Sequence, residues 1–293
     1  MNKHTFLEIL HSGRQIVSDG ATGTNLIARG LPHGTTAENW VIDQPEQIVR
    51  LHAEFIAAGA DLILTSTFGA TPLRLAGSSL AGRAAEVNQR AVELARQAIG
   101  TLPVWIAGSL GPVGGLLKPY GPLEVADVTA SYAEQARALA DAGADLLAIE
   151  TQFDLTEAKA AIQGVRSVTD LPLICSFSYD RGRRTMMGVS PTQAARQLAD
   201  LGIQAIGINC GRSLEENLQN LVELRQATGL PIWFKPNAGL PHVDEQNRTA
   251  YSVTPAEMGA LAPAWLEAGA QIIGGCCGTT PEHLTHIARA VKP

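Results

Sequence analysis

The stretch ALADAGADLLAIETQ, residues 138–152, contains the pattern from which the fold can be predicted. A helical segment runs to Gly143, and a short apolar run follows and ends in the polar pair Glu150-Thr151. A glycine directly after a helix suits a left-handed C-cap. A short, continuous aliphatic run is typical of a strand that is buried on both faces. The stretch therefore predicts a helix, a turn and a parallel strand, in that order.

The same pattern recurs along the whole chain. It returns in AEFIAAGADLILTSTF (53–68), QLADLGIQAIGINCG (197–211) and WLEAGAQIIGGCCG (265–278). With three proline-led runs and one early run, the candidate strands begin at Gln15, Asp61, Val104, Asp145, Leu173, Ala205, Ile232 and Gln271. Alternating β and α units in this number predict an α/β fold, a (β/α)8 TIM-type barrel that forms a single domain over residues 1–293. An open doubly wound sheet is the alternative.

Composition and charge indicate which binding partners the protein is expected to have. The chain is 45% hydrophobic and 17% charged, with a net charge of −6 and no cluster of Lys and Arg, so neither nucleic acid nor an anionic membrane is an expected partner. A small-molecule substrate is expected instead. The N-terminus lacks the apolar core of a signal peptide, and no apolar run approaches the ~18 residues of a membrane span. We therefore expect a cytoplasmic protein.

Polar residues stand at the carboxyl end of each predicted strand. In a barrel of this kind the active site lies at that end. The strand ends contain Asp19, Ser66, Ser109, Glu150, Ser176, Asn209, Cys210, Lys235, Cys276 and Cys277. Three cysteines and two carboxylates are therefore expected to converge on one mouth.

The cysteines indicate either metal binding or thiol chemistry. Four cysteines are too few for a disulfide framework. Zinc favours thiolates, and a catalytic zinc site has three protein ligands and one open position, which Cys210, Cys276 and Cys277 could supply. Buried cysteine can also be a small core residue, and this is the favoured interpretation of Cys175. For the other three, spacing alone leaves both interpretations open.

Adjacent cysteines raise a geometric objection. Successive side chains of a regular strand point to opposite faces, so Cys276 and Cys277 cannot both bind one ion from ideal strand geometry. Gly274, Gly275 and Gly278 flank the pair, and glycine permits a kinked or left-handed backbone. We expect these glycines to turn both sulfurs inward.

Seven motifs give the chain a resemblance to a known family. They are DGATGT (19–24), TSTFGA (65–70), GSLGPVGGLLKPYGPL (108–123), IETQFD (149–154), INCG (208–211), KPNAGLP (235–241) and GGCCGTTPEH (274–283). In this order they resemble the homocysteine S-methyltransferase family, which includes the homocysteine-binding module of cobalamin-dependent methionine synthase and betaine–homocysteine methyltransferase. The resemblance runs from about Val17 to about Ile287.

The resemblance implies a zinc-dependent barrel enzyme that methylates the thiol of homocysteine to give methionine. Cys210, Cys276 and Cys277 match the family's zinc ligands. Asp19 and Glu150 match acidic residues near the amino-acid end of homocysteine. Zinc would hold the substrate sulfur as a thiolate, the nucleophilic form, so no catalytic residue beyond that thiolate is expected.

The remaining site assignments concern the amino-acid end of the substrate. Asp19 and Glu150 are expected to bind its ammonium group, and backbone N–H groups around Thr22 and Gly23 its carboxylate. Asn209 is expected to contribute to substrate binding or to cap a loop. Asn237 has the same two interpretations, and His242 is expected on a surface loop.

The methyl donor stays open at this point. The motifs lie closer to the methionine-synthase module than to the betaine enzyme, which has an aromatic residue where this chain has Gly69. Because the sequence shows no cofactor module of its own, the expected donors are S-methylmethionine, another sulfonium compound, a quaternary amine, or a methyl-corrinoid on a separate protein. Two alternatives are a barrel lyase or isomerase with a structural zinc, and a non-catalytic homocysteine or metal binder.

Overall fold

Eight parallel strands form the centre of the computed structural model, which describes residues 5–32, 34–243 and 249–292. In spatial order they run β1-β10-β7-β6-β5-β4-β3-β2. Their bounds are β1 (Ile16–Val17), β2 (Leu62–Leu64), β3 (Trp105–Leu110), β4 (Leu146–Gln152), β5 (Leu173–Phe177), β6 (Ala205–Cys210), β7 (Ile232–Pro236) and β10 (Ile272–Ile273).

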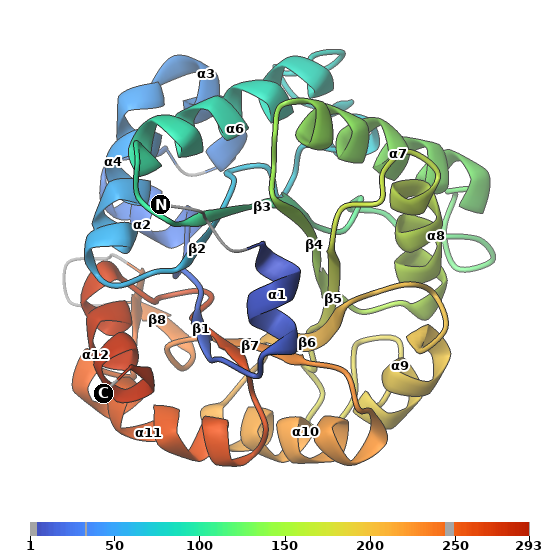
Figure 1. The fold of residues 1–293 in the computed structure, drawn as a ribbon. Helices are drawn as coiled ribbons and strands as arrows, with labels where there is room; N and C mark the ends of the chain where they lie inside the picture. The colour runs from blue at the N-terminus through green and yellow to red at the C-terminus, as the bar shows by residue number, and fades with distance from the viewer. Residues whose placement is uncertain (1–4, 33, 244–248, 293) are drawn as a thin grey trace.

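The sheet closes on itself between β1 and β2, the strands at the two ends of this spatial order. Ser18, directly after β1, forms a parallel bridge with Leu62 of β2, and the Asp61 N–H donates to the Val17 carbonyl at 2.7 Å. Figure 1 shows the resulting ring of strands with helices around it. The predicted (β/α)8 barrel is confirmed, and all eight predicted strands form at the predicted places.

The outer ring consists of the helices that the repeated pattern predicts. The long ones are α4 (Pro45–Ala57), α6 (Ala84–Ile99), α7 (Val125–Asp141), α8 (Leu155–Arg166), α9 (Pro191–Leu198), α10 (Leu214–Ala227), α11 (Pro255–Glu267) and α12 (Pro281–Val291). Short helices α2 (Gly23–Ala28), α3 (Ala37–Asp43) and α5 (Pro72–Leu75) lie in the first two βα connections. Glycines after the helices adopt the predicted left-handed backbone, as at Gly143 with φ 92°. No helix within the described ranges is long and apolar enough to span a bilayer.

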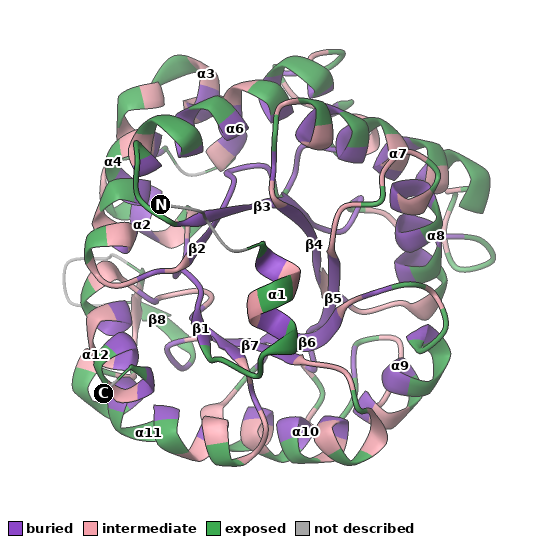
Figure 2. Ribbon diagram, in the orientation of Figure 1, coloured by how far each residue is buried: buried purple, intermediate pink, exposed green. Residues whose placement is uncertain are grey.

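The amino-terminal end of the barrel is closed by helix α1 (Phe6–His11). Figure 1 shows α1 in the centre of the strand ring, and Gln271, just before β10, donates to the Leu10 carbonyl at 2.7 Å. Phe6 and Leu10 are buried among the inward-facing strand residues, with the Phe6 ring edge-on to Trp105 at 5.9 Å between centroids. Figure 2 shows the barrel strands as buried, and α1 among them with buried, half-buried and exposed parts. The opposite, carboxyl end of the strands is left for the site.

Like α1, a short hairpin lies outside the predicted pattern. An antiparallel hairpin, β8 (Pro241–Val243) with β9 (Thr249–Tyr251), lies in the connection from β7 to α11. His242 lies exposed on β8, which agrees with its expected place at the surface. The Tyr251 ring packs so closely over Gly278 that a Cβ atom there would lie 2.2 Å from the ring. The hairpin therefore contacts the turn that contains the adjacent cysteines.

Candidate active site

A pocket of about 510 Å³ opens at the carboxyl end of the strands. This volume lies within the usual range for small-molecule sites. Its floor contains Glu150, Lys235 and all three of the grouped cysteines, and the turn after β1 forms one wall. Four of the five expected groups, the three cysteines and Glu150, therefore line one mouth. The fifth, Asp19, is buried against Lys235 and does not line the pocket itself.

The three cysteines come together as the sequence predicts. The Sγ atoms of Cys210, Cys276 and Cys277 lie within 4.8 Å of one another, and those of Cys210 and Cys276 are 2.9 Å apart. Cys175 is separate from them, fully buried in the core, as expected. A cluster of three half-buried thiols beside an open pocket has the ligand set of a thiolate metal site with one free position.

The backbone of Cys210 is left-handed, a conformation uncommon outside glycine. Its φ is 60° and that of Gly211 is 80°. Two amides hold this turn: Asn217 donates to the Cys210 carbonyl at 2.7 Å, and Asn237 donates to the Gly211 carbonyl at 2.8 Å. Asn237 thus caps a loop, one of its two expected roles. A non-glycine residue with this strain is a common feature of functional sites.

The adjacent cysteines lie beyond their strand. β10 ends at Ile273, and Cys276 belongs to a turn in which Thr279 donates its N–H to the Cys276 carbonyl at 3.0 Å. Gly278 is left-handed with φ 82°, as expected. Gly274 is required for a different reason, because a Cβ atom there would lie 2.5 Å from the Asp19 carbonyl oxygen. The alternation of a strand therefore does not apply to the pair.

The three cysteine thiols differ in pKa. Hydrogen bonds from the Cys210 and Cys276 thiols lower the pKa of Cys277 to about 3. The same interactions, together with burial, raise the pKa of Cys210 well above its ordinary value. One thiolate among three cysteines is therefore favoured across the physiological pH range.

Asn209 faces the sulfurs from the end of β6. Its Nδ2 donates to Thr151 Oγ1 at 2.6 Å and lies 3.5 Å from Cys210 Sγ and 3.9 Å from Cys276 Sγ. Its Oδ1 accepts hydrogen bonds from the Thr151 N–H and the Ser176 hydroxyl, at 2.8 and 2.7 Å. These bonds fix the amide plane, so Asn209 is placed to orient the cysteines. The sequence places Thr151 at a strand end but indicated no role for it; its backbone is also left-handed, with φ 61°.

Glu150 is a buried acid on the pocket floor. It is 7% exposed, and its Oε1 accepts a hydrogen bond from the Ser109 hydroxyl. Burial raises the pKa of Glu150 to about 7, although the positive charge of Lys235 opposes this shift. A cationic group in the pocket would stabilise the ionised carboxylate.

Asp19 forms an ion pair that sequence reasoning missed. Its Oδ1 lies 2.6 Å from Lys235 Nζ, and its Oδ2 accepts the Leu64 N–H at 2.8 Å. The side chains of Lys235 and Asp19 are only 3% and 2% exposed. These residues are 216 positions apart, so only the expected convergence of strand ends could have indicated the pair.

The turn after β1 forms the wall expected to contact a carboxylate. Thr22 and Gly23 line the pocket at the start of α2, and N–H groups in the first turn of a helix have no partner within the helix. Thr24 Oγ1 accepts the Gly278 N–H at 3.2 Å. This bond ties the turn to the segment that contains the adjacent cysteines.

The outer part of the pocket is lined mainly by apolar side chains. Ile27, Leu31 and Phe68 line it, with Phe68 37% exposed. Glu38 also lines it and is 3% exposed, and it accepts the Gly69 N–H. A Cβ atom at Gly69 would lie 3.2 Å from this carboxylate. The outer pocket therefore combines apolar walls with one buried acid.

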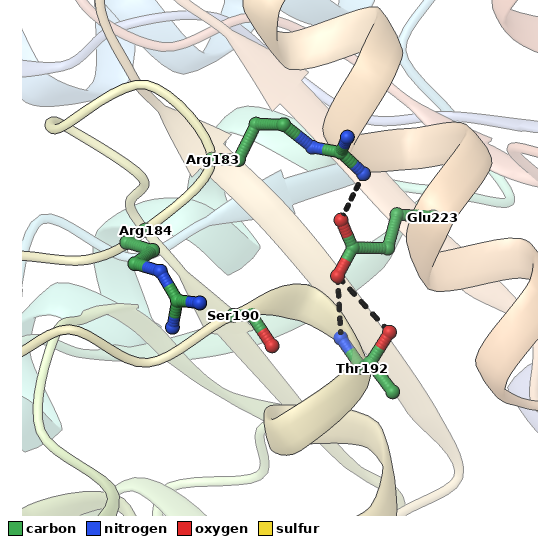
Figure 3. Close-up of a pocket in the computed structure, with 5 residues that line it drawn as sticks. All are labelled: Arg183, Arg184, Ser190, Thr192 and Glu223. Carbon is green, nitrogen blue, oxygen red and sulfur yellow. Dashed lines mark hydrogen bonds and ion pairs between the residues drawn. The ribbon is translucent and has the colours of Figure 1, made fainter.

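A second hollow lies between the loop after β5 and α10. Figure 3 shows Glu223 between Arg183 and Thr192, paired with Arg183 and accepting hydrogen bonds from the Thr192 hydroxyl at 3.0 Å and its N–H at 3.3 Å. Arg184 donates to the Gly188 carbonyl at 2.8 Å. These charged groups are partnered within the protein, and the hollow contains no cysteine. The pocket with the three cysteines is therefore the candidate active site.

Comparison with known proteins identifies the family. The family model described as homocysteine S-methyltransferase matches residues 16–291. The chain belongs to the homocysteine S-methyltransferase family. The resemblance that the seven motifs carry is thereby confirmed.

Individual homocysteine S-methyltransferase relatives agree in sequence and fold. Methionine synthase from Mycobacterium tuberculosis is 32% identical over 311 residues, which cover 99% of this chain and 26% of that protein. The chain thus spans about a quarter of that relative. The metallated crystal structure of the homocysteine methyltransferase MmuM from Escherichia coli has a TM-score of 0.82 at 28% identity, covering 96% of this chain and 98% of that one. A methyltransferase from Methanosarcina mazei, with 14% identity and a TM-score of 0.62, shares the fold.

Proposed function

We propose that this protein transfers a methyl group from a small sulfonium donor to the thiol of homocysteine, with zinc bound by Cys210, Cys276 and Cys277. The observation that carries the proposal is the cluster of three Sγ atoms within 4.8 Å at the floor of an open pocket. The family supplies homocysteine as acceptor. Zinc, the site roles and the donor are our inference.

The residues present fit a zinc ion. Thiolates are preferred ligands of zinc, and the cluster offers three, the number found in catalytic sites. Asn209 lies beside two of the sulfurs and meets the need for a hydrogen-bonding partner that orients the ligands. When bound, zinc would keep a coordinated thiol deprotonated and hence nucleophilic.

Homocysteine would bind with its amino-acid end near Glu150 and the turn after β1. Its ammonium group would contact Glu150, whose buried carboxylate lacks a full counter-charge. Its carboxylate would contact N–H groups near Thr22 and Gly23. Asp19 already accepts hydrogen bonds from Lys235 and Leu64, so we propose that it contributes mainly by holding Lys235.

The outer pocket favours a sulfonium donor. Phe68 and the aliphatic wall suit alkyl groups, and the ring face of Phe68 and the carboxylate of Glu38 would attract a positive charge. The substrate sulfur would attack the donor methyl carbon in line, forming one S–C bond as the donor's S–CH3 bond breaks. A neutral thioether would leave. A methyl-corrinoid on another protein would have to approach the same mouth from outside.

The decisive experiment combines zinc analysis with X-ray absorption at the zinc edge. We expect one zinc per chain, with three sulfur neighbours that become four when homocysteine is added. Turnover with S-methylmethionine, and none with methylcobalamin, would support the sulfonium donor. A zinc with four protein ligands that does not respond to homocysteine would instead indicate a structural metal in a lyase or isomerase. Tight thiol binding without turnover with any donor would indicate a binding protein.

A further inference from the structure

Lys235 is the one lysine or arginine classed as buried in the part of the chain that the structure describes. It is held on β7 by Asp19 at 2.6 Å, and its Nζ lies 5.2 Å from the Trp233 ring centroid. Burying an ammonium group is costly unless it is paired and hydrogen-bonded. The position therefore needs a reason beyond packing, which an aliphatic side chain would serve better.

The ammonium group has more donors than its partner uses. It carries three N–H donors. Among residues 5–32, 34–243 and 249–292, Lys235 Nζ donates one hydrogen bond, to Asp19. Lys235 lines the same pocket as Glu150 and Cys276. Its positive charge opposes the raised pKa of Glu150, so the two side chains interact electrostatically. Two donors therefore remain for a ligand between these residues.

The charges of the pocket match a zwitterion. Asp19 neutralises Lys235 in part and fixes its position, while Glu150 lies in the same pocket with its own negative charge. An amino acid that places its sulfur at the cysteines would bring one ammonium and one carboxylate group into this space. The ammonium group is complementary to Glu150, and the carboxylate is complementary to the spare donors of Lys235.

We propose that Lys235 is a specificity-determining residue that binds the α-carboxylate of the thiol substrate, with Asp19 as its positioning residue. This inference rests on the proposed function, because it takes a thiol amino acid as the ligand. Lys235 would bind one carboxylate oxygen while the turn at Thr22 and Gly23 binds the other. The site would thereby select amino-acid thiols over simple aminothiols.

The test compares two ligands that differ only in the carboxylate. Homocysteine and 3-aminopropane-1-thiol share the thiol, the chain and the amine. Calorimetry on the zinc-loaded protein would measure both affinities for the wild type, Lys235→Met and a surface control, Lys159→Met. We expect the wild type and the control to prefer homocysteine, and Lys235→Met to lose about tenfold or more of that preference. The affinity for 3-aminopropane-1-thiol should change much less.

The comparison separates the outcomes. Equal loss of affinity for both thiols in Lys235→Met would overturn the proposal, because Lys235 would then only support the pocket. If the wild type binds neither thiol, the proposed function fails and the assignment of Lys235 with it. Should Lys235→Met not fold because Asp19 is left unpaired, the double variant Asp19→Asn with Lys235→Met removes both charges. An unchanged ratio of the two affinities in that variant would overturn the proposal equally.

Discussion

The pH dependence of stability should change measurably when Glu150 is replaced by glutamine. Burial raises the pKa of Glu150 from 4.5 to about 7 in the folded protein. In the unfolded chain the carboxyl group ionises near its ordinary pKa. Between these two values the unfolded state releases a proton that the folded state retains, so the folded state loses stability as pH rises from 4.5 to about 7. Above that range the loss is complete.

The magnitude follows from the two pKa values. At about 1.4 kcal/mol per pKa unit, the wild type should lose ~0.8 kcal/mol through this group by about pH 5 and ~3.3 kcal/mol by about pH 8. Glutamine keeps the shape and does not ionise. The advantage of Glu150→Gln over the wild type in free energy of unfolding should therefore grow by ~2.5 kcal/mol between these pH values.

Urea denaturation of the reduced, zinc-free protein, followed by circular dichroism, would measure this difference. Glu134→Gln, the same substitution at an exposed position on α7, serves as the control. A flat difference curve for Glu150→Gln would refute the reasoning that burial dominates the environment of Glu150. The same variant should bind homocysteine more weakly, which would show that the acid is retained for binding at the expense of stability.

Three further predictions concern the cysteines and the barrel end. Cys210→Ser should reduce zinc content well below one per chain, and retention of a full equivalent would exclude Cys210 as a ligand. In the zinc-free protein at about pH 6, iodoacetamide should modify Cys277 first, because the pKa of this thiol is lowered to about 3. Bound zinc should protect Cys277 from the reagent. Modification of Cys210 or Cys175 before Cys277, followed by mass spectrometry, would contradict this. Phe6→Ala should lower the free energy of unfolding by about 3 kcal/mol, because it opens a cavity beside Trp105. The zinc content should not change. A loss below about 1 kcal/mol in the same denaturation assay would show that α1 contributes little to the stability of the barrel.

The fold could be predicted because its signals are local and repeated. Each helix, glycine and apolar run lies within one short stretch, as in 138–152, and repetition around the chain leaves few topologies. The hairpin β8–β9 and the closing helix α1 were not predicted. The hairpin strands are exposed or half-buried and have three residues each, so they lack the continuous apolar pattern of the barrel strands. The place of α1 depends on contacts with residues distant in sequence, such as Trp105.

The sequence was sufficient to predict which residues of the site lie together, but not their backbone conformations or their side-chain pairs. Barrel topology brings strand ends together, so the convergence of Cys210 with Cys276 and Cys277 followed from their positions. The left-handed backbone of Cys210 did not, because that conformation is uncommon for a cysteine and depends on Asn217. The pairing of Asp19 with Lys235 was missed because neither residue has a local feature that points to the other.

Helix α1 also has a consequence for the order in which the two reactants come and go. Because α1 fills the amino-terminal end of the barrel, the pocket with Glu150 and the cysteines opens at the carboxyl end of the strands, where Phe68 and the apolar wall line it. On the proposed function, the acceptor must bind beneath the donor, and methionine can leave only after the demethylated donor has gone. Initial-rate kinetics should therefore show a compulsory sequence, with the acceptor first on and its product last off.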